Sequence, residues 1–171
     1  FTGSLLIGHA TTGTISSANY NTALGILALN ALTTGDNNLA VGYNAGTDIT
    51  EGSSNVLVGK GSGVSLTTGS KNVAIGTDTL QTEDTGNFNI AIGFETLKNL
   101  NYDGNAYNVA VGYQAGKEVT TGVRNILVGG FAGGSLTTGV HNVAMGYSAL
   151  ATEDTGSRNT ALGYQALKNL N

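Results

Sequence analysis

The side chains that could carry out chemistry are few and widely spaced. The chain of 171 residues contains two histidines, His9 and His141, and no cysteine. Two pairs of adjacent acids, Glu83-Asp84 and Glu153-Asp154, lie in equivalent Thr- and Gly-rich stretches. A catalytic triad or a metal site needs several such groups close together, and adjacent acids in a turn are more typical of a solvated loop than of general acid–base catalysis. The sequence therefore predicts no enzyme activity, no metal and no cofactor.

A short sequence repeat defines the structural units of the chain, and any functional site would have to be built on these units. The sequence Asn-Val-Ala-Val-Gly at residues 108–112 returns along the chain, and its closing glycine falls at residues 8, 25, 42, 59, 76, 93, 112, 129, 146 and 163. The interval is 17 residues, except for one of 19 between Gly93 and Gly112. We number each unit from its asparagine, so that the glycine is position 5. A fixed period this short is typical of a solenoid, in which one repeat forms one coil.

The composition of one unit favours strands over helices. Each unit has a short β-branched run, a glycine, small and apolar residues at positions 8 and 12, and a Thr-Gly pair near positions 14 and 15. Glycine and β-branched residues are poor in helix interiors, and no apolar period of 3.6 residues persists for three turns. We expect an all-β chain: a single parallel β-solenoid over residues 1–171, made of ten 17-residue coils.

A longer period of 70 residues, or four coils, lies above the first. Position 9 reads Gly, Gly, Leu, Leu in residues 38–107 and again in residues 108–171. Position 3 carries leucine at Leu57 and Leu127 and alanine at the other positions of both blocks. Neither end of the chain shows a polar capping unit, which a free solenoid needs. We therefore interpret the chain as a stretch of a longer repeating polymer.

The strands are apolar or small on both faces. Alternate residues of a strand face opposite sides, so positions 2 and 4 share one face and positions 3 and 5 share the other. A strand that is apolar on both sides is buried on both sides. We expect positions 2 and 4 to fill the coil and position 3 to contact another chain in a parallel homo-oligomer. The alternative is that the same coil covers position 3. The predicted interface comprises Ala40, Leu57, Ala74, Ala91, Ala110, Leu127, Ala144 and Ala161.

Two further columns of equivalent residues have side chains that could interact. Position 1 is asparagine in nine units and Ser4 in one, which predicts a ladder of amide hydrogen bonds along the solenoid rather than metal ligands. Position 6 is often aromatic, and such rings either pack between chains or contact cell-surface glycans. The aromatic residues of this column are Tyr43, Phe94, Tyr113, Tyr147 and Tyr164.

Charge and hydropathy exclude two classes of partner. The net charge of −4 argues against nucleic acid, which requires a basic face. No run of about 20 apolar residues is present, so the sequence predicts no membrane insertion. Charged residues make up only 11% of the chain, which is low for the surface of a soluble monomer. We therefore expect part of the surface to meet another chain.

The repeat resembles two families of fibrous proteins. The core Asn-x-Ala/Leu-Val/Ile-Gly, followed by a small residue and a Thr-Gly turn, resembles the YadA-like head repeats of trimeric autotransporter adhesins. It is also similar to the repeats of phage tail fibres at Thr33-Thr34-Gly35, at residues 21–25 and at residues 164–167. The resemblance implies a left-handed β-roll, a homotrimer, and a location outside the cell, at the cell surface or on a virion.

The function expected from these observations is that of a shaft segment of an extracellular or virion fibre or adhesin, with a surface that could contact cell-surface glycans. The alternative is a monomeric ice-binding or other flat-surface-binding solenoid. That alternative needs two adjacent unbroken threonine columns, and we identify one broken column, at position 14. Its threonines are Thr34, Thr68, Thr85, Thr121, Thr138 and Thr155.

Overall fold

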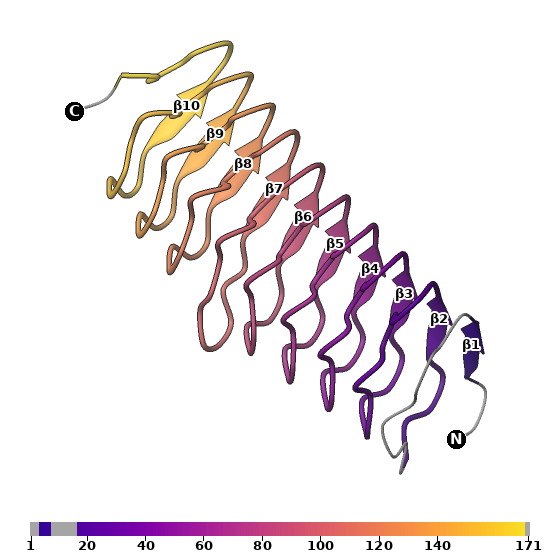
Figure 1. The fold of residues 1–171 in the computed structure, drawn as a ribbon. Helices are drawn as coiled ribbons and strands as arrows, with labels where there is room; N and C mark the ends of the chain where they lie inside the picture. The colour runs from indigo at the N-terminus through magenta and orange to yellow at the C-terminus, as the bar shows by residue number, and fades with distance from the viewer. Residues whose placement is uncertain (1–3, 8–16, 170–171) are drawn as a thin grey trace.

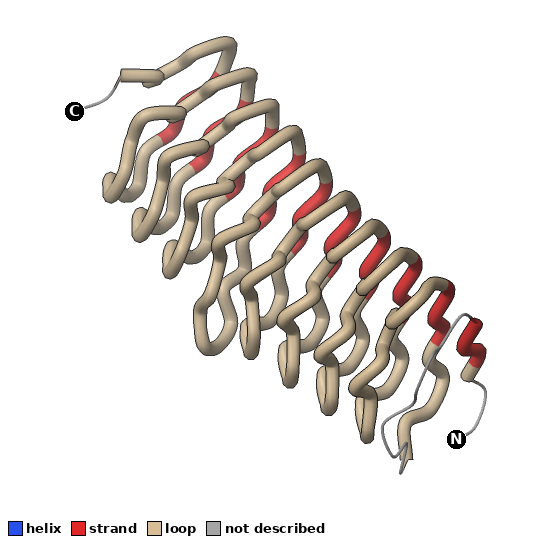
Figure 2. Tube along the Cα trace, in the orientation of Figure 1, coloured by secondary structure: helices blue, strands red, loops and turns tan. Residues whose placement is uncertain are grey.

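The computed structural model describes residues 4–7 and 17–169, and these form a rod of stacked coils (Figure 1). One short strand per coil lies on the same side of the rod, and the described chain contains no helix (Figure 2). None of the described segments could therefore cross a membrane as a helix. The strands are β1 (Leu5–Ile7), β2 (Thr22–Leu24), β3 (Leu39–Val41), β4 (Val56–Val58), β5 (Val73–Ile75), β6 (Ile90–Ile92), β7 (Val109–Val111), β8 (Ile126–Val128), β9 (Val143–Met145) and β10 (Thr160–Leu162).

The strands form one parallel sheet in sequence order, with each strand paired to the next. Ala110 pairs with Leu127 at an offset of 17 residues, and Ala91 pairs with Ala110 at an offset of 19. The interval from Gly93 to Gly112 is two residues longer than the others, and these two residues lie outside the strands, so the register of the sheet is kept. The predicted all-β parallel solenoid is confirmed. Residues 8–16, with His9, and residues 170–171 lie outside the described part, so the predicted count of ten coils stays a prediction, as does the handedness.

The core is a thin layer inside the coil, and position 3 belongs to it. Ala110 is fully buried, as are its equivalents from β3 to β10. They pack in one cluster with the small residues of position 8 and the leucines and other aliphatic residues of positions 9 and 12. The interface expected at Ala40, Leu57, Ala74, Ala91, Ala110, Leu127, Ala144 and Ala161 is therefore wrong, because their own coil encloses these side chains. The interior is too narrow for two rows of valine and isoleucine, so positions 2 and 4 face outward.

The glycine at position 5 allows the chain to turn directly after each strand. Gly112 has φ +134°, and a Cβ built there would lie 2.6 Å from the carbonyl oxygen of Gly129 in the next coil. Only glycine combines this backbone conformation with such a close approach. The repeat of glycine every coil follows from this stacking.

The predicted amide ladder is present and buried. The Oδ1 atom of Asn21 accepts from the backbone N–H of Asn38 at 2.9 Å and from its Nδ2 at 3.1 Å. The same Nδ2 also donates to the carbonyl oxygen of Gly52 at 2.8 Å. The pattern repeats up the rod and lengthens at the 19-residue unit, where the Asn108 N–H lies 3.4 Å from Asn89 Oδ1. Each amide thus joins two coils and satisfies polar groups that would otherwise be costly to bury.

Candidate interaction surface

The side of the sheet that faces away from the coil carries four columns of side chains. Around β7, Tyr107 and Tyr113 are exposed, Val109 and Val111 are half-buried, and the residues between them alternate inward. In the repeat numbering these outward residues are position 17, which precedes the asparagine, and positions 2, 4 and 6. We call this four-column surface the outer sheet face.

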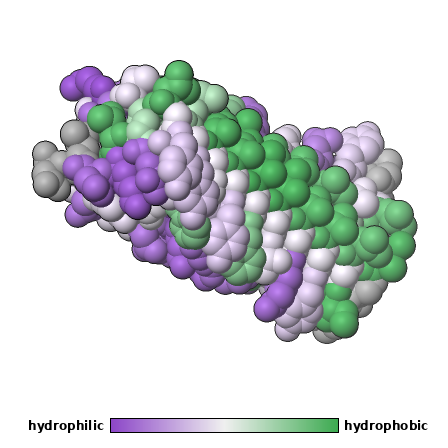
Figure 3. Space-filling view, turned by 90° about the horizontal axis from the view of Figure 1, so that it is seen from above, coloured by the Kyte–Doolittle hydropathy of each residue, from purple (hydrophilic) through white to green (hydrophobic). Residues whose placement is uncertain are grey.

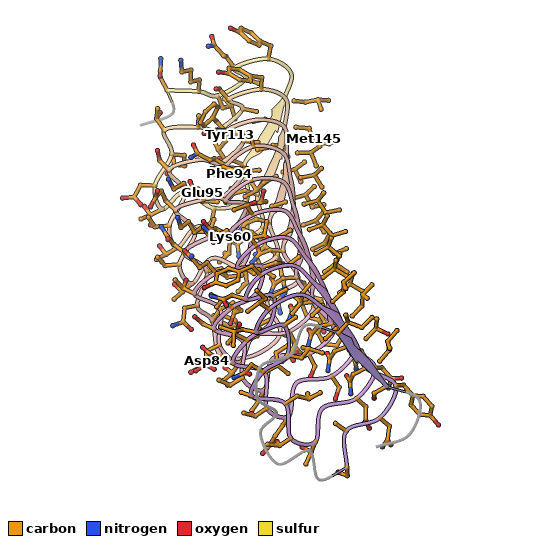
Figure 4. All side chains as sticks on the ribbon, turned by 45° about the vertical axis from the view of Figure 1, so that its right-hand side comes forward. Lys60, Asp84, Phe94, Glu95, Tyr113 and Met145 are labelled. Carbon is orange, nitrogen blue, oxygen red and sulfur yellow. The ribbon has the colours of Figure 1, made fainter. Side chains whose placement is uncertain are left out.

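The two central columns of the outer sheet face form an apolar strip, made of positions 2 and 4 of every strand. Ten strands contribute two residues each; 18 of the 20 are aliphatic or methionine, Thr22 and Thr160 are the other two, and none is charged. Figure 3 shows hydrophobic residues as a green band along the rod, and in Figure 4 the side chain of Met145 projects from the strand away from the coil. Patches of this kind larger than a few hundred Å² are typical of interaction sites. The large side chains most exposed in the strip are Leu5, Ile7, Leu24, Ile75, Ile90, Ile126, Met145 and Leu162.

The position-6 column borders the strip on one side and forms an aromatic ladder in the second half of the rod. The ring centroids of Phe94 and Tyr113 lie 5.3 Å apart, and those of Tyr147 and Tyr164 lie 5.8 Å apart, in stacked geometry. Phe131 joins the two pairs by edge-to-face contacts of 5.2 Å and 5.8 Å. Tyr113 and Phe94 follow each other in adjacent coils in Figure 4. The predicted aromatics Tyr43, Phe94, Tyr113, Tyr147 and Tyr164 are all exposed.

Phe131 was not among the predicted residues because it occupies position 7. Its unit has Gly130 at position 6, and a Cβ there would lie 3.3 Å from the Tyr147 ring. The small residue leaves room for the phenylalanine that follows it to enter the ladder. The Gly-Phe order in this one unit is the signal that could have revealed the substitution. Phe94 and Tyr113 share one pair of ring faces and Tyr147 and Tyr164 share another, whereas Phe131 lies edge-to-face between the two pairs.

The position-17 column borders the strip on the other side and mixes cations with aromatic rings. The ammonium of Lys71 lies 4.9 Å from the ring centroid of Phe88, whose other partner is Tyr107 at 5.1 Å in stacked geometry. Three of the seven Lys and Arg residues of the chain are in this column. Sequence reasoning missed it, because no single residue type recurs there. The described members are Tyr20, Asn37, Ser54, Lys71, Phe88, Tyr107, Arg124, His141 and Arg158, and all have φ between 53° and 62°.

Glu83 is buried, contrary to the expectation of a solvated turn. Its carboxylate accepts from the backbone N–H of Gly86 at 2.8 Å and of Tyr102 at 3.4 Å. In regular coils the corresponding glycine N–H donates to a carbonyl of the next coil, as Gly52 does to Thr67 at 3.1 Å. At Gly86 the carboxylate of Glu83 is the acceptor instead. Burial raises the pKa of Glu83 above its ordinary value, although its backbone hydrogen bonds oppose this.

Glu153 occupies the equivalent place in the second block. It is half-buried, and its carboxylate accepts from the Gly156 N–H at 2.5 Å. Asp84 and Asp154, the second member of each acidic pair, accept from the hydroxyls of Thr67 and Thr137 in the preceding coil. The two acidic pairs are therefore structural turn residues in this fold.

A charged cluster lies beside the aromatic ladder, at position 7. The carboxylate of Glu95 contacts Lys98 Nζ at 2.7 Å, Lys117 Nζ at 3.0 Å and Gln114 Nε2 at 2.8 Å. Hydrogen bonds from these groups, chiefly Lys98, lower the pKa of Glu95 to about 2. A shallow groove of about 360 Å³ adjoins it, with Phe131 in its lining. No nucleophile is paired with a base there, so the cluster fastens two coils together.

The structure brings together two threonine columns rather than one. Position 13 also carries threonine, but its hydroxyls point along the rod: Thr33 donates to the Thr50 carbonyl at 3.0 Å, and Thr50 donates to the Thr67 carbonyl at 3.3 Å. Position 14 is exposed at Thr68 and Thr138. The inner column is interrupted by Asp84, Asn101 and Asp154, and its hydroxyls already have partners.

Within residues 4–7 and 17–169 no three His, Asp or Glu side chains gather as metal ligands would. Comparison of the chain with protein-family models, with curated proteins and with solved structures gave no match.

Proposed function

We propose that this chain is a structural segment of a fibre, in which parallel copies pack against one another through the outer sheet face. The single observation that carries the proposal is the apolar strip, which runs along the rod from β1 to β10 with no charged residue at any of its positions. The 18 charged residues counted as Lys, Arg, Asp and Glu all lie elsewhere in the chain. A rod that functioned alone in water would place polar side chains on this face.

The size of the outer sheet face fits a protein interface. Ten strands about 4.8 Å apart, and about 3.3 Å per residue from position 17 to position 6, give a face of about 43 Å by about 20 Å. That area, about 850 Å², is close to the ~800 Å² per partner of a standard stable interface. Burying its apolar part would also stabilise the short three-residue strands.

The resemblance to adhesin heads and tail-fibre repeats implies that three copies assemble around a common axis. It also implies a location outside the cell or on a virion. The asparagines of position 1 and the glycines of position 5 support a shaft role. They join each coil to the next in the same way, so coils can be added without a fixed limit to the length of the rod. Since Phe94 stacks on Tyr113 and Tyr147 stacks on Tyr164, we attribute this column to packing rather than to stacking on glycans.

Sedimentation equilibrium of the purified chain at low concentration tests the proposal. We expect a mass of three times the 17.2 kDa of one chain. A folded monomer at micromolar concentration would overturn the proposal. If such a monomer also showed thermal hysteresis, the flat-surface-binding alternative would replace it.

A further inference from the structure

The groove beside the aromatic ladder has the size of a small ligand site. Its lining comes from positions 7, 10 and 11 in the coils of β7, β8 and β9, which follow the position-6 border of the outer sheet face along the chain. Its volume of about 360 Å³ is at the small end of the range of ligand sites, about 300–1,000 Å³. The groove therefore suits one ring-sized molecule, and it is built within one chain.

The groove exists because position 10 is small in two successive coils. Gly134 and Ala151 occupy this position in the coils of β8 and β9, and both line the groove. In the other coils whose position 10 is described, the residue is larger: Asn30, Thr47, Val64, Gln81, Lys98, Lys117 and Lys168. Two small residues in a row thus leave a space over two coils.

Phe131 gives the groove an aromatic wall. Phe94 and Tyr113 stack within 9° of parallel, and Tyr147 and Tyr164 stack within 13°, so these rings turn their faces along the column. The ring of Phe131 is turned by 69° from Tyr113 and by 86° from Tyr147. It therefore directs its edges at the two neighbours and keeps its faces out of the ladder. Because Phe131 lines the groove, a ring face is available to a ligand there.

Two serine hydroxyls line the same groove without a partner in the protein. Ser148 is only 7% exposed, and its backbone N–H donates to the carbonyl oxygen of Gly130 at 2.8 Å. Its hydroxyl makes no hydrogen bond to any residue that the structure describes, and neither does that of Ser135. A hydroxyl can donate one hydrogen bond and accept two, and a buried one is costly without a partner. A ligand in the groove would supply that partner.

The charges of the lining favour a neutral ligand. Lys117 Nζ is already paired with the Glu95 carboxylate at 3.0 Å. The exposed carboxylate of Glu118 accepts from Asn99 Nδ2 at 2.8 Å through one of its two oxygens. An anion would meet Glu118 and a cation that is already paired, whereas a metal ion would find one carboxylate beside a lysine. A purely apolar ligand would leave the serine hydroxyls unpaired.

We propose that this groove binds a neutral sugar in its pyranose form, with the C–H face of the sugar ring on Phe131 and its hydroxyls bonded to Ser135, Ser148 and Glu118. A pyranose has an apolar ring face and a rim of hydroxyls that donate and accept, which matches one aromatic face and a polar rim. The site goes beyond the structural role proposed above and needs only one chain.

The first 70-residue block provides an internal comparison. Its equivalent positions carry Gly61 in place of Phe131, Val64 in place of Gly134 and Gln81 in place of Ala151. The same coils are thus built there without the ring and with larger residues at position 10. These three exchanges are a way to remove the site with residues that this fold already accepts.

Saturation-transfer NMR of the purified chain tests the proposal. The probes are the methyl glycosides of glucose, galactose, mannose and N-acetylglucosamine, with that of glucuronic acid as the anionic comparison. We expect at least one neutral glycoside to bind with a dissociation constant on the order of 1 mM. Its free sugar and a trisaccharide that contains it then separate a single sugar from a residue of a glycan chain, and either ligand in the groove supports the site.

The variants show whether the groove is where binding occurs. Phe131→Gly/Gly134→Val/Ala151→Gln should abolish binding, and Ala151→Gln alone serves if the triple variant does not fold. Ser148→Ala should weaken binding about tenfold, the loss expected for one hydrogen bond. Phe94→Ala, in the ladder but outside the groove, should bind like the parent.

Three results would overturn the site: no binding of any neutral glycoside, binding of the glucuronide alone, or unchanged binding in the folded groove variants. Oligomeric mass is a separate readout. A monomeric chain that binds sugar overturns the fibre proposal and keeps the groove, and a trimer that binds none does the reverse.

Discussion

The side chain of Leu57 occupies the space that a side chain at Gly63 would need. A Cβ built on Gly63 would lie 2.9 Å from Leu57 Cδ2, and one built on Gly46 would lie 2.7 Å from Leu57 Cδ1. Leu127 stands in the same relation to Gly116 and Gly133. In the coils of β5 and β6 position 3 is alanine and position 9 is a buried leucine. In the coils of β3 and β7 both positions are small, and the leucine at position 3 of the next coil fills the space. The 70-residue period is therefore an exchange of volume between two positions of one thin core.

This exchange predicts coupled stabilities. Gly63→Leu should lower the free energy of unfolding strongly, because the new side chain collides with Leu57 and must keep φ +56°. Leu57→Ala alone should cost about 2–5 kcal/mol by leaving a cavity. The double variant should be more stable than the sum of the two costs by about 1–3 kcal/mol. Urea titration of the four proteins measures the coupling, and additive costs would mean that the two positions do not share space.

A second prediction concerns position 3 itself. Ala110→Asp should prevent folding of the single chain, because the carboxylate would be enclosed in the core without a partner. Circular dichroism should show loss of the strand signal. The matched control is Thr138→Asp, at an exposed turn position, which should be within about 0.5 kcal/mol of the parent. A folded Ala110→Asp chain would mean that position 3 faces outward after all.

Glu83 predicts a stability that falls as pH rises. Its pKa is raised in the folded chain, so its contribution is fully present below the ordinary pKa of 4.5 and is lost as pH rises through the raised value. Glu83→Gln keeps one acceptor oxygen for the Gly86 N–H and cannot ionise. The melting temperature of the variant should therefore change less between pH 4.5 and pH 7 than that of the parent. Identical pH profiles would show that this carboxyl titrates normally.

Glu95 predicts the opposite trend at acid pH. Its pKa is lowered to about 2 by Lys98, Lys117 and Gln114, so its stabilising contribution is present above pH 4.5 and is lost as the pH falls towards 2. Glu95→Gln should remove that acid-side loss and cost about 1 kcal/mol or less at neutral pH, since accessible ion pairs contribute little. Unfolding midpoints between pH 2 and pH 5 provide the measurement. An acid-side loss that persists unchanged in the variant would assign it to other carboxylates.

Much of the architecture was predictable from the sequence, and the reason is physical. Gly112 and Asn108 recur because stacking demands a glycine at the turn and a buried amide between coils, so they mark each strand to the residue. Which face of the strand points into the coil was not predictable, because Val109 on one face and Ala110 on the other are both acceptable in a core. Only the narrowness of the interior, visible in the contacts of Leu57, decides between them.

The surface was harder to predict than the strands. The exposed aromatics of position 6 were found from their column, but Phe131 entered the ladder from the neighbouring position. The position-17 column escaped notice because Lys71, Phe88 and Arg124 share a place in the coil rather than a residue type. Glu83 looked solvated, because acids in a Thr- and Gly-rich stretch are typical of turns, but it occupies position 12, which is buried in other coils as at Leu66 and Leu136.

The central claim is that the apolar strip holds copies of the chain together. The most direct test is the solution mass, by light scattering, of the variant Val111→Lys/Val128→Lys, with Thr68→Lys/Thr138→Lys as the control of equal charge on exposed turns. Lysines that stay solvated in the monomer should leave the coil folded, but must lose their hydration when copies pack. We predict a folded chain of 17.2 kDa for the variant and a trimer for both the parent and the control. A variant that assembles like the parent would contradict the account.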